Sequence, residues 1–109
     1  MNYHWIMDIH IEDSADLDED IRIGSGSKVW HLAQIRSGAK IGSNCIVGRG
    51  AYIGPKVEIG NNVKIQNYAL IYDPAKIAEG AFIGPGVVLT NDTYPRSVSP
   101  DGKSKSSKY

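Results

Sequence analysis

Several side chains that could bind or activate a substrate are spread along this chain. The imidazole of His31 could accept a proton near neutral pH or hold a substrate, and the guanidinium of Arg49 could pair with a phosphate or a carboxylate. The amides of Gln66 and Asn67 and the phenol of Tyr72 offer further hydrogen bonds. Whether these groups form one site depends on the elements that position them.

The element that positions these residues is a strict six-residue repeat. An aliphatic residue occupies every sixth position: Ile11, Leu17, Ile23, Val29, Ile35, Ile41, Val47, Ile53, Ile59, Ile65, Ile71, Ile77, Ile83 and Leu89. Neither an α-helix, with a period of about 3.6, nor an ordinary strand, with a period of about 2, produces this spacing. A hexapeptide repeat does, and it predicts an all-β fold of stacked coils, a β-helix.

Two other positions of the repeat are also restricted. Two residues before each aliphatic residue stands a mostly small side chain, such as Ala33, Cys45 or Ala69. Both positions point to the same side of a strand, so we predict that both face inward and that Cys45 is a core residue rather than a nucleophile. Three residues after the aliphatic position, Gly and Asn predominate and predict turns with positive φ. Leu32, Lys56, Tyr68 and Pro74 are among the exceptions at this position.

The composition excludes some classes of function. The chain has 109 residues with 12 basic and 12 acidic side chains, so its charge gives no reason to expect binding to nucleic acid or to a membrane surface. The single cysteine permits no internal disulfide, which fits a reducing compartment. No apolar run approaches the roughly 18 residues of a membrane helix, and the first residues lack the basic start of a signal peptide. We therefore predict a soluble, cytoplasmic protein.

Three of the hexapeptides carry a family resemblance. The segments 41–46 (Ile-Gly-Ser-Asn-Cys-Ile), 59–64 (Ile-Gly-Asn-Asn-Val-Lys) and 77–82 (Ile-Ala-Glu-Gly-Ala-Phe) resemble the repeats of left-handed β-helix acyltransferases. The resemblance implies a single-stranded left-handed parallel β-helix of about four to five triangular coils, with three hexapeptides in each coil. This hand is an exception to the usual right-handed crossover. The family also implies a homotrimer.

On such a coil, residues 18 apart stack in columns. The outward column of Arg22, Lys40, Glu58 and Lys76 is charged and is predicted to face solvent. The outward column of Gln34, Tyr52, Leu70 and Val88 is largely apolar, so we predict that it packs in the homotrimer. Scattered apolar surface residues are the alternative interpretation. The polar corners on either side of this column are where we place the site.

Four irregular motifs carry a finer resemblance. They are Lys28-Val-Trp-His-Leu32, Lys64-Ile-Gln-Asn67, Ile71-Tyr72, and Leu89-Thr-Asn91 followed by Pro95-Arg-Ser97. They are similar to motifs of sugar-nucleotide N-acetyltransferases, in particular those that act on UDP-2-acetamido-3-amino-2,3-dideoxyglucuronate. The resemblance covers Ile11 to about Ser97 and implies transfer of an acetyl group from acetyl-CoA, the co-substrate, to a sugar amine.

The resemblance also implies residue roles. Asn91 matches the family asparagine near the reacting amine, where its amide could orient the amine or stabilise the oxyanion, and His31 is the second candidate catalytic residue. The candidate substrate-binding residues are Arg49, Gln66, Asn67, Tyr72 and Arg96. Plainer interpretations stay open: His31 could be an exposed turn histidine, and Asn91 could begin the turn that Pro95 completes.

We expect an N-terminal cap over residues 1–8, the β-helix over residues 9–96 and a flexible tail over residues 97–109. Members of the resembled family continue through further coils that bind much of the CoA. We therefore expect this chain to be such an N-acetyltransferase or the sugar-nucleotide side of one. It would then be a fragment, a truncated relative, or one half of a two-chain enzyme whose second chain supplies those coils.

Two other functions compete with this one. A trimeric β-helix that binds a nucleotide sugar or a partner protein without catalysis is the main alternative. A zinc hydrase of the γ-carbonic anhydrase kind would need three histidines gathered from two chains. Apart from His10 at its edge, the repeat contains only His31, so we expect no metal site.

Overall fold

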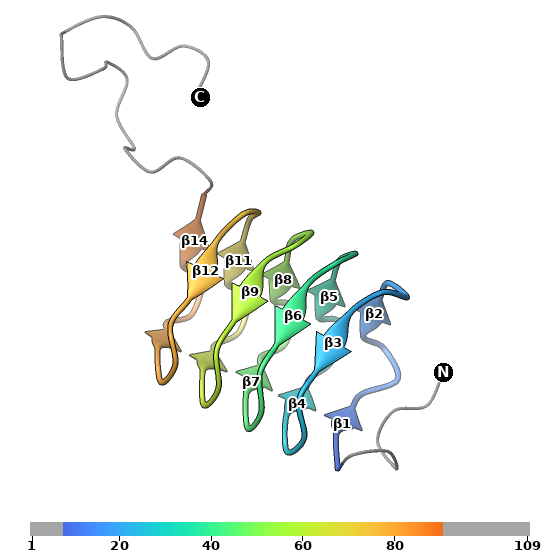
Figure 1. Ribbon diagram of the computed structural model, residues 1–109. Helices are drawn as coiled ribbons and strands as arrows, with labels where there is room; N and C mark the ends of the chain where they lie inside the picture. Colours follow the sequence, from blue (N-terminus) through green and yellow to red (C-terminus); the bar gives the residue numbers. More distant parts are fainter. Residues whose placement is uncertain (1–7, 91–109) are drawn as a thin grey trace, which may run out of the picture.

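The computed structural model describes residues 8–90, which form a prism of stacked coils with one two-residue strand in each hexapeptide (Figure 1). The predicted cap falls mostly outside the described residues, as do Asn91, Arg96 and the predicted tail. Residues 8–90 contain no helix, and therefore none that is long and apolar enough to cross a membrane.

The strands form three parallel sheets, one on each side of the prism. The first face consists of β1 (His10–Ile11), β4 (Lys28–Val29), β7 (Ile46–Val47), β10 (Lys64–Ile65) and β13 (Phe82–Ile83). The second face consists of β2 (Asp16–Leu17), β5 (Gln34–Ile35), β8 (Tyr52–Ile53), β11 (Leu70–Ile71) and β14 (Val88–Leu89). The third face consists of β3 (Arg22–Ile23), β6 (Lys40–Ile41), β9 (Glu58–Ile59) and β12 (Lys76–Ile77).

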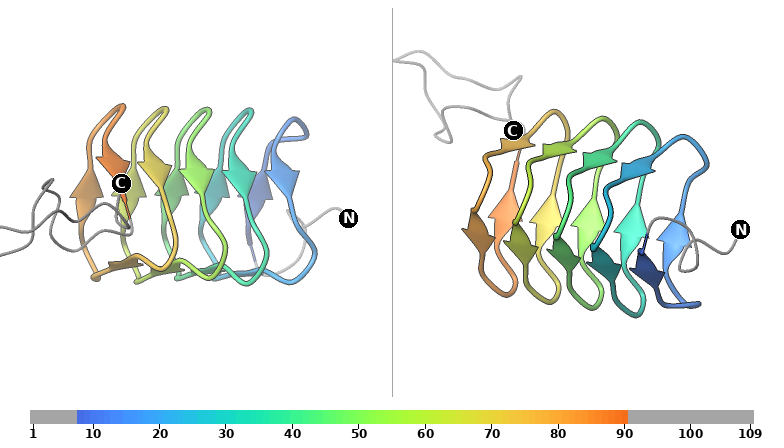
Figure 2. Two further views of the ribbon diagram at one scale, coloured as in Figure 1. Left: turned by 90° about the horizontal axis from the view of Figure 1, so that it is seen from above. Right: turned by 60° about the horizontal axis from the view of Figure 1, so that its bottom comes forward.

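The strand register confirms the predicted coil length. His10 pairs with Lys28, and Leu70 pairs with Val88. Paired residues are thus 18 apart in the sequence, so each coil contains three hexapeptides. Figure 2 shows the coils stacked one behind another with the strands of each face aligned. The fold is the predicted all-β, left-handed parallel β-helix. We name the corners in chain order: the first lies between the first and second faces, the second between the second and third, and the third between the third and first.

Inward side chains fill the interior as predicted. The aliphatic series is fully buried in the middle coils, as at Ile35, Ile53 and Ile65, and the small series is fully buried at Ala33 and Cys45. The thiol of Cys45 lies 3.1 Å from the carbonyl oxygen of Gly60, which confirms a core position. Removal of this apolar surface from water is the main term that stabilises the coils.

One inward position is polar, which the repeat pattern did not predict. The side chain of Ser27 is almost fully buried in the small series. Its hydroxyl donates to the carbonyl oxygen of Gly42 at 2.8 Å and accepts from the amide of Cys45 at 3.0 Å. Both hydrogen-bonding capacities are therefore satisfied, and burial carries little penalty.

The corners turn at the predicted glycine and asparagine positions. Gly26, Gly50, Asn44 and Asn62 have positive φ values, as do the exceptions Leu32, Lys56 and Tyr68, each at 61°. Positive φ strains a residue with a side chain, at a cost of order 1 kcal/mol. The fourth exception, Pro74, follows a cis peptide bond.

Candidate functional site

The second face carries an outward stripe that changes character along the prism. Asp16 and Gln34 are exposed at its start, and Tyr52, Leu70 and Val88 follow in strict register. Tyr52 and Leu70 are half-buried, whereas Val88 is 51% exposed. The apolar part of the stripe thus occupies the later coils, and the first and second corners flank it as predicted.

At the first corner, the side chain of His31 is bound to the coil before it. Its Nε2 lies 3.0 Å from a carboxylate oxygen of Glu12, and its Nδ1 lies 3.3 Å from the hydroxyl of Ser14. The same hydroxyl accepts the amide of Leu32 at 2.9 Å, so it can donate to Nδ1. This arrangement assigns the ring proton to Nε2. A carboxylate that fixes a ring N–H is an arrangement that orients a histidine base, but here both nitrogens already have partners within the chain.

Further along the first corner, Arg49, Asn67 and Tyr68 contact one another. The Oδ1 of Asn67 accepts the amide of Arg49 at 2.9 Å, and the Nε of Arg49 donates to the phenol oxygen of Tyr68 at 3.1 Å. Asn61 makes the same contact with the amide of Ser43 at the third corner, at 2.8 Å. The Asn67 oxygen therefore has a structural role, which leaves its NH₂ group and the terminal guanidinium nitrogens of Arg49 to meet a ligand.

The ring of Tyr68 explains the glycine in the coil before it. A Cβ added to Gly50 would lie 2.4 Å from the Tyr68 ring, and Gly50 itself has φ +66°. Tyr68 therefore folds back across Gly50 toward Arg49 rather than extending into solvent, although it is 55% exposed. This contact with Gly50 and Arg49 explains locally why Tyr68 stands at a turn position that is usually Gly or Asn.

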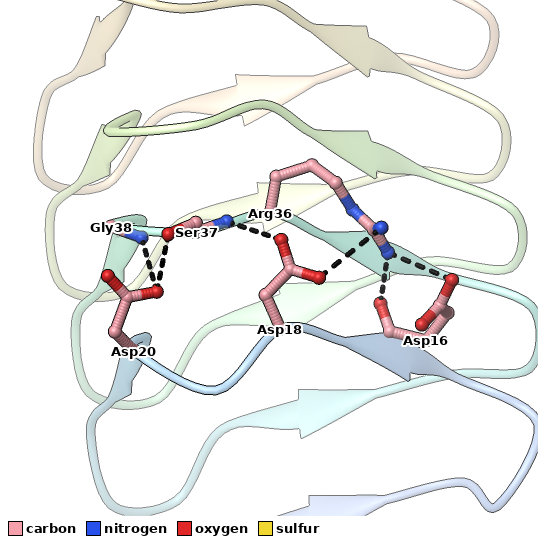
Figure 3. A network of polar contacts seen from close by, with 6 residues as sticks. All are labelled: Asp16, Asp18, Asp20, Arg36, Ser37 and Gly38. Carbon is pink, nitrogen blue, oxygen red and sulfur yellow. Dashed lines mark hydrogen bonds and ion pairs between the residues drawn. The ribbon is translucent and has the colours of Figure 1, made fainter.

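The start of the second corner is held by a network that sequence reasoning missed (Figure 3). Arg36 donates to the backbone carbonyl of Asp16 at 2.7 Å and pairs with the carboxylates of Asp16 at 3.1 Å and Asp18 at 3.4 Å. Asp18 also accepts the amide of Ser37 at 2.8 Å. The acids precede Arg36 and Ser37 by about one coil, so their spacing was a signal available in the sequence.

Asp20 completes this network. Its carboxylate accepts the hydroxyl of Ser37 at 2.6 Å and the amide of Gly38 at 3.2 Å. The hydrogen bond from Ser37 holds the pKa of Asp20 below its ordinary value of 3.8. Desolvation opposes this shift, and hydrogen bonds from the backbone amides of Asp20 and Gly38 add smaller lowering effects.

In the later part of the second corner, fewer polar side chains have hydrogen-bond or ion-pair partners among residues 8–90. Tyr72 packs against Tyr52 of the second face, with ring centroids 5.4 Å apart and planes tilted by 46°. Its neighbour Asp73 is exposed and has no side-chain partner among residues 8–90, and neither has the half-buried Gln66 of the first corner. Among residues 8–90, these polar groups border the apolar stripe and keep unused hydrogen-bonding capacity.

The predicted site residues therefore fall into three sets. Arg49, Gln66 and Asn67 share the first corner with His31, but His31 is tied to the first coil. Tyr72 lies across the second face from them, on the second corner. Asn91 and Arg96 lie outside the described residues, so their roles stay predictions. Within residues 8–90, no three His, Cys, Asp or Glu side chains are placed to hold a metal ion.

Comparison with known proteins places this fold in a family. A family model described as bacterial transferase hexapeptide (six repeats) matches residues 20–55 and again residues 56–91. The chain is similar to the acetyltransferase domain of PglB from Neisseria gonorrhoeae FA1090, with 25% identity, a TM-score of 0.72, and coverage of 73% of this chain and 39% of that one. It is also similar to a hexapeptide transferase family protein from Anaplasma phagocytophilum, with 15% identity, a TM-score of 0.42, and coverage of 75% of this chain and 69% of that one.

No curated protein matched the chain. The chain spans about two fifths of the PglB acetyltransferase domain that it resembles. The family model, by contrast, accounts for most of the β-helix through both of its matches. The chain belongs to the bacterial transferase hexapeptide family.

Proposed function

We propose that the chain forms the sugar-nucleotide side of an acetyl-CoA-dependent N-acetyltransferase that acts on an amino sugar nucleotide. The observation that carries the proposal is the similarity to an acetyltransferase domain over 73% of the chain. The four irregular motifs supply the finer assignment to a sugar-nucleotide substrate. We also propose a cytoplasmic location, where acetyl-CoA would be available.

The proposed reaction is attack of a neutral sugar amine on the thioester carbonyl of acetyl-CoA. An N–C bond forms, the C–S bond breaks, the amine loses a proton and CoA leaves as the thiol. Because a neutral amine is already nucleophilic, alignment of the two substrates can supply much of the rate. In this proposal Asn91 orients the amine or stabilises the oxyanion, and His31 receives the proton directly or holds the sugar.

Binding of the sugar nucleotide is assigned to the corners of the later coils. Arg49 would pair with the diphosphate, and Arg96 is proposed as a second cation for phosphate or carboxylate. The side chains of Gln66 and Asn67 would donate to sugar or base oxygens, with Tyr72 on the opposite side of the second face. The packed rings of half-buried Tyr52 and exposed Tyr72 offer an apolar surface beside these polar groups.

We further propose a homotrimer that packs through the column of Gln34, Tyr52, Leu70 and Val88. The outward side chain of Leu70, which is only half-buried in a single chain, supports this contact. Burying its remaining apolar surface between subunits would be favourable. At low protein concentration, Leu70→Glu should yield a monomer in size-exclusion chromatography, whereas Lys40→Glu on the charged third face should leave the trimer intact. If Leu70→Glu elutes at the same volume as the wild type, the homotrimer does not pack through this column.

The activity is tested with the full chain, acetyl-CoA and UDP-2-acetamido-3-amino-2,3-dideoxyglucuronate. Mass spectrometry should detect a sugar nucleotide heavier by one acetyl group. Asn91→Ala should lose most of the turnover while it retains binding in calorimetry, and Ser25→Ala at the third corner should behave as wild type. Because the chain spans 39% of the PglB domain, acetyl-CoA binding is measured separately, and a second chain that supplies further coils is part of the proposal.

A binding module without catalysis is the second candidate. The partners of His31 within the chain favour it, since both ring nitrogens contact Glu12 and Ser14 of the first coil instead of a substrate. This candidate predicts that the sugar nucleotide binds equally to wild type and Asn91→Ala and that neither forms product. Product formed by wild type alone would exclude it.

A further inference from the structure

The last coil of the described β-helix is open on all three faces. β12, β13 and β14 each pair with one neighbouring strand, in the coil before them. The inward residues Ile77, Ile83 and Leu89 are only half-buried, whereas their counterparts one coil earlier are at most 4% exposed. The prism thus ends in a partly exposed apolar triangle.

Backbone amides around this triangle have no partners among residues 8–90. In the inner coils, the amide that precedes each aliphatic residue donates to the next coil, as from Lys28 to Cys45 at 2.8 Å and from Lys64 to Ala81 at 3.0 Å. The equivalent amides of Lys76, Phe82 and Val88 have no such acceptor within the described part of the chain. An unpaired strand edge of this kind is a template for another strand.

The first coil presents the complementary edge. In the second coil, the carbonyls of Ala33 and Ala39 accept the amides of Asp16 at 2.8 Å and Arg22 at 3.0 Å. The equivalent carbonyls of Ala15 and Ile21 accept no hydrogen bond between residues 8 and 90. The aliphatic residues Ile11, Leu17 and Ile23 of this coil are also half-buried. One chain therefore carries a donor edge at one end and a matching acceptor edge at the other.

The sequence after Leu89 does not continue the pattern that a further coil needs. The six-residue register places Pro95, Asp101 and Ser107 at the next three aliphatic positions. A coil built on these side chains would cover the apolar triangle with a proline, a carboxylate and a hydroxyl, which is unfavourable. A second copy of the chain meets the requirement, because its first coil offers aliphatic side chains and strand carbonyls in the same triangular arrangement.

We propose that copies of this chain stack head to tail, with the last coil of one β-helix pairing with the first coil of the next. The amides of Phe82 and Val88 would donate to strand carbonyls of the neighbour, and the two apolar triangles would cover each other. The contact joins two different surfaces and leaves both outer ends open, so it adds further copies as concentration rises. It is separate from the proposed lateral contact and does not require the proposed activity, but it uses the same end of the prism that a second chain with further coils would occupy.

Sedimentation of the full chain tests the proposal. In the Leu70→Glu background, which removes the lateral contact, the mean size should grow with concentration. The double variant Phe82→Pro/Val88→Pro removes two unpaired amides and should associate about tenfold or more weakly than the matched control Phe82→Ala/Val88→Ala. Because both side chains are exposed, circular dichroism and thermal unfolding should be alike for the two variants.

Mixing supplies a second readout. The proline variant keeps an intact first coil, so it can join the open end of a wild-type stack and stop its growth. Adding it in equal amount should reduce the mean size, and adding the alanine control should not. Stacks of unchanged size would overturn the proposal.

Amide hydrogen exchange keeps the proposal falsifiable even if the proline variants unfold. In the Leu70→Glu chain, the amides of Phe82 and Val88 should exchange more slowly as concentration rises, while the exposed amide of Glu19 should not change. A single species at all concentrations, or amides at the last coil that exchange equally fast throughout, would contradict head-to-tail stacking.

Discussion

The early and late coils of this β-helix use their polar side chains differently. Four of the five ion pairs among residues 8–90 involve Asp16, Asp18, His31 or His10 in the early coils. The fifth, between Lys76 and Glu58, spans 3.9 Å on an exposed surface. At the corners of the late coils, Gln66 and Asp73 have no side-chain partner in the described range.

This difference indicates which end holds the fold and which end can hold a ligand. In the early coils, carboxylates accept amide and guanidinium donors from the following coil, so their hydrogen-bonding capacity is used within the chain. In the late coils, the side chains of Gln66 and Asp73 border an apolar stripe, and their hydrogen-bonding capacity is not used among residues 8–90. A polar group that is free at an apolar surface is suited to recognition.

The largest expected effect separates the middle of the core from its open end. Ile53→Ala removes a fully buried side chain between two coils and should lower the free energy of unfolding by about 2–5 kcal/mol. Ile77→Ala removes the same atoms from the half-buried last coil and should cost about 1–2 kcal/mol. Urea unfolding of both variants measures the difference, and equal losses would show that the last coil is as well covered as the middle.

Substitution of two arginines, Arg36 and Arg49, should have effects of intermediate magnitude on stability and binding. Arg36→Ala removes the contacts with Asp16 and Asp18 and should lower stability by about 1–2 kcal/mol, since the acids are partly exposed. Arg49→Ala removes one exposed bond to Tyr68 and should cost about 0.5 kcal/mol or less. Calorimetry with the sugar nucleotide should show the opposite order, with weaker binding for Arg49→Ala alone. Weaker binding for Arg36→Ala, with Arg49→Ala unchanged, would reverse the assignment of the two ends.

The smallest expected effect is a pH dependence. Because hydrogen bonds lower the pKa of Asp20 in the folded state, its carboxylate stabilises the fold above the pKa of the unfolded chain. This contribution should disappear as the pH falls below about 4 toward the lower folded pKa. The melting temperature of Asp20→Asn should therefore lie below that of wild type at neutral pH and approach it in acid. Glu19→Gln is the control, because it removes a charge from the same turn and the Glu19 side chain has no hydrogen-bonded partner among residues 8–90.

The sequence predicted the fold because the six-residue period and the inward small residues leave few other ways to bury Ile35, Ile53 and Ile65. It also placed Arg49 and Asn67 on one corner, since the strand register follows directly from the repeat. The side-chain contacts could not be predicted in this way. That His31 turns toward Glu12 and Ser14, or that Tyr68 folds across Gly50, depends on torsions that a repeat pattern does not specify.

The central claim is that the late coils carry most of the groups that bind the substrate, with His31 as the one early residue proposed to reach it. Titration of the ¹⁵N-labelled chain with UDP-2-acetamido-3-amino-2,3-dideoxyglucuronate, followed by NMR, tests it most directly. We predict shifts of the amide signals of Gln66, Tyr72 and Asp73, with those of Asp20 and Ser37 unchanged. Shifts confined to Asp20 and Ser37, or no shifts at saturating ligand, would contradict it.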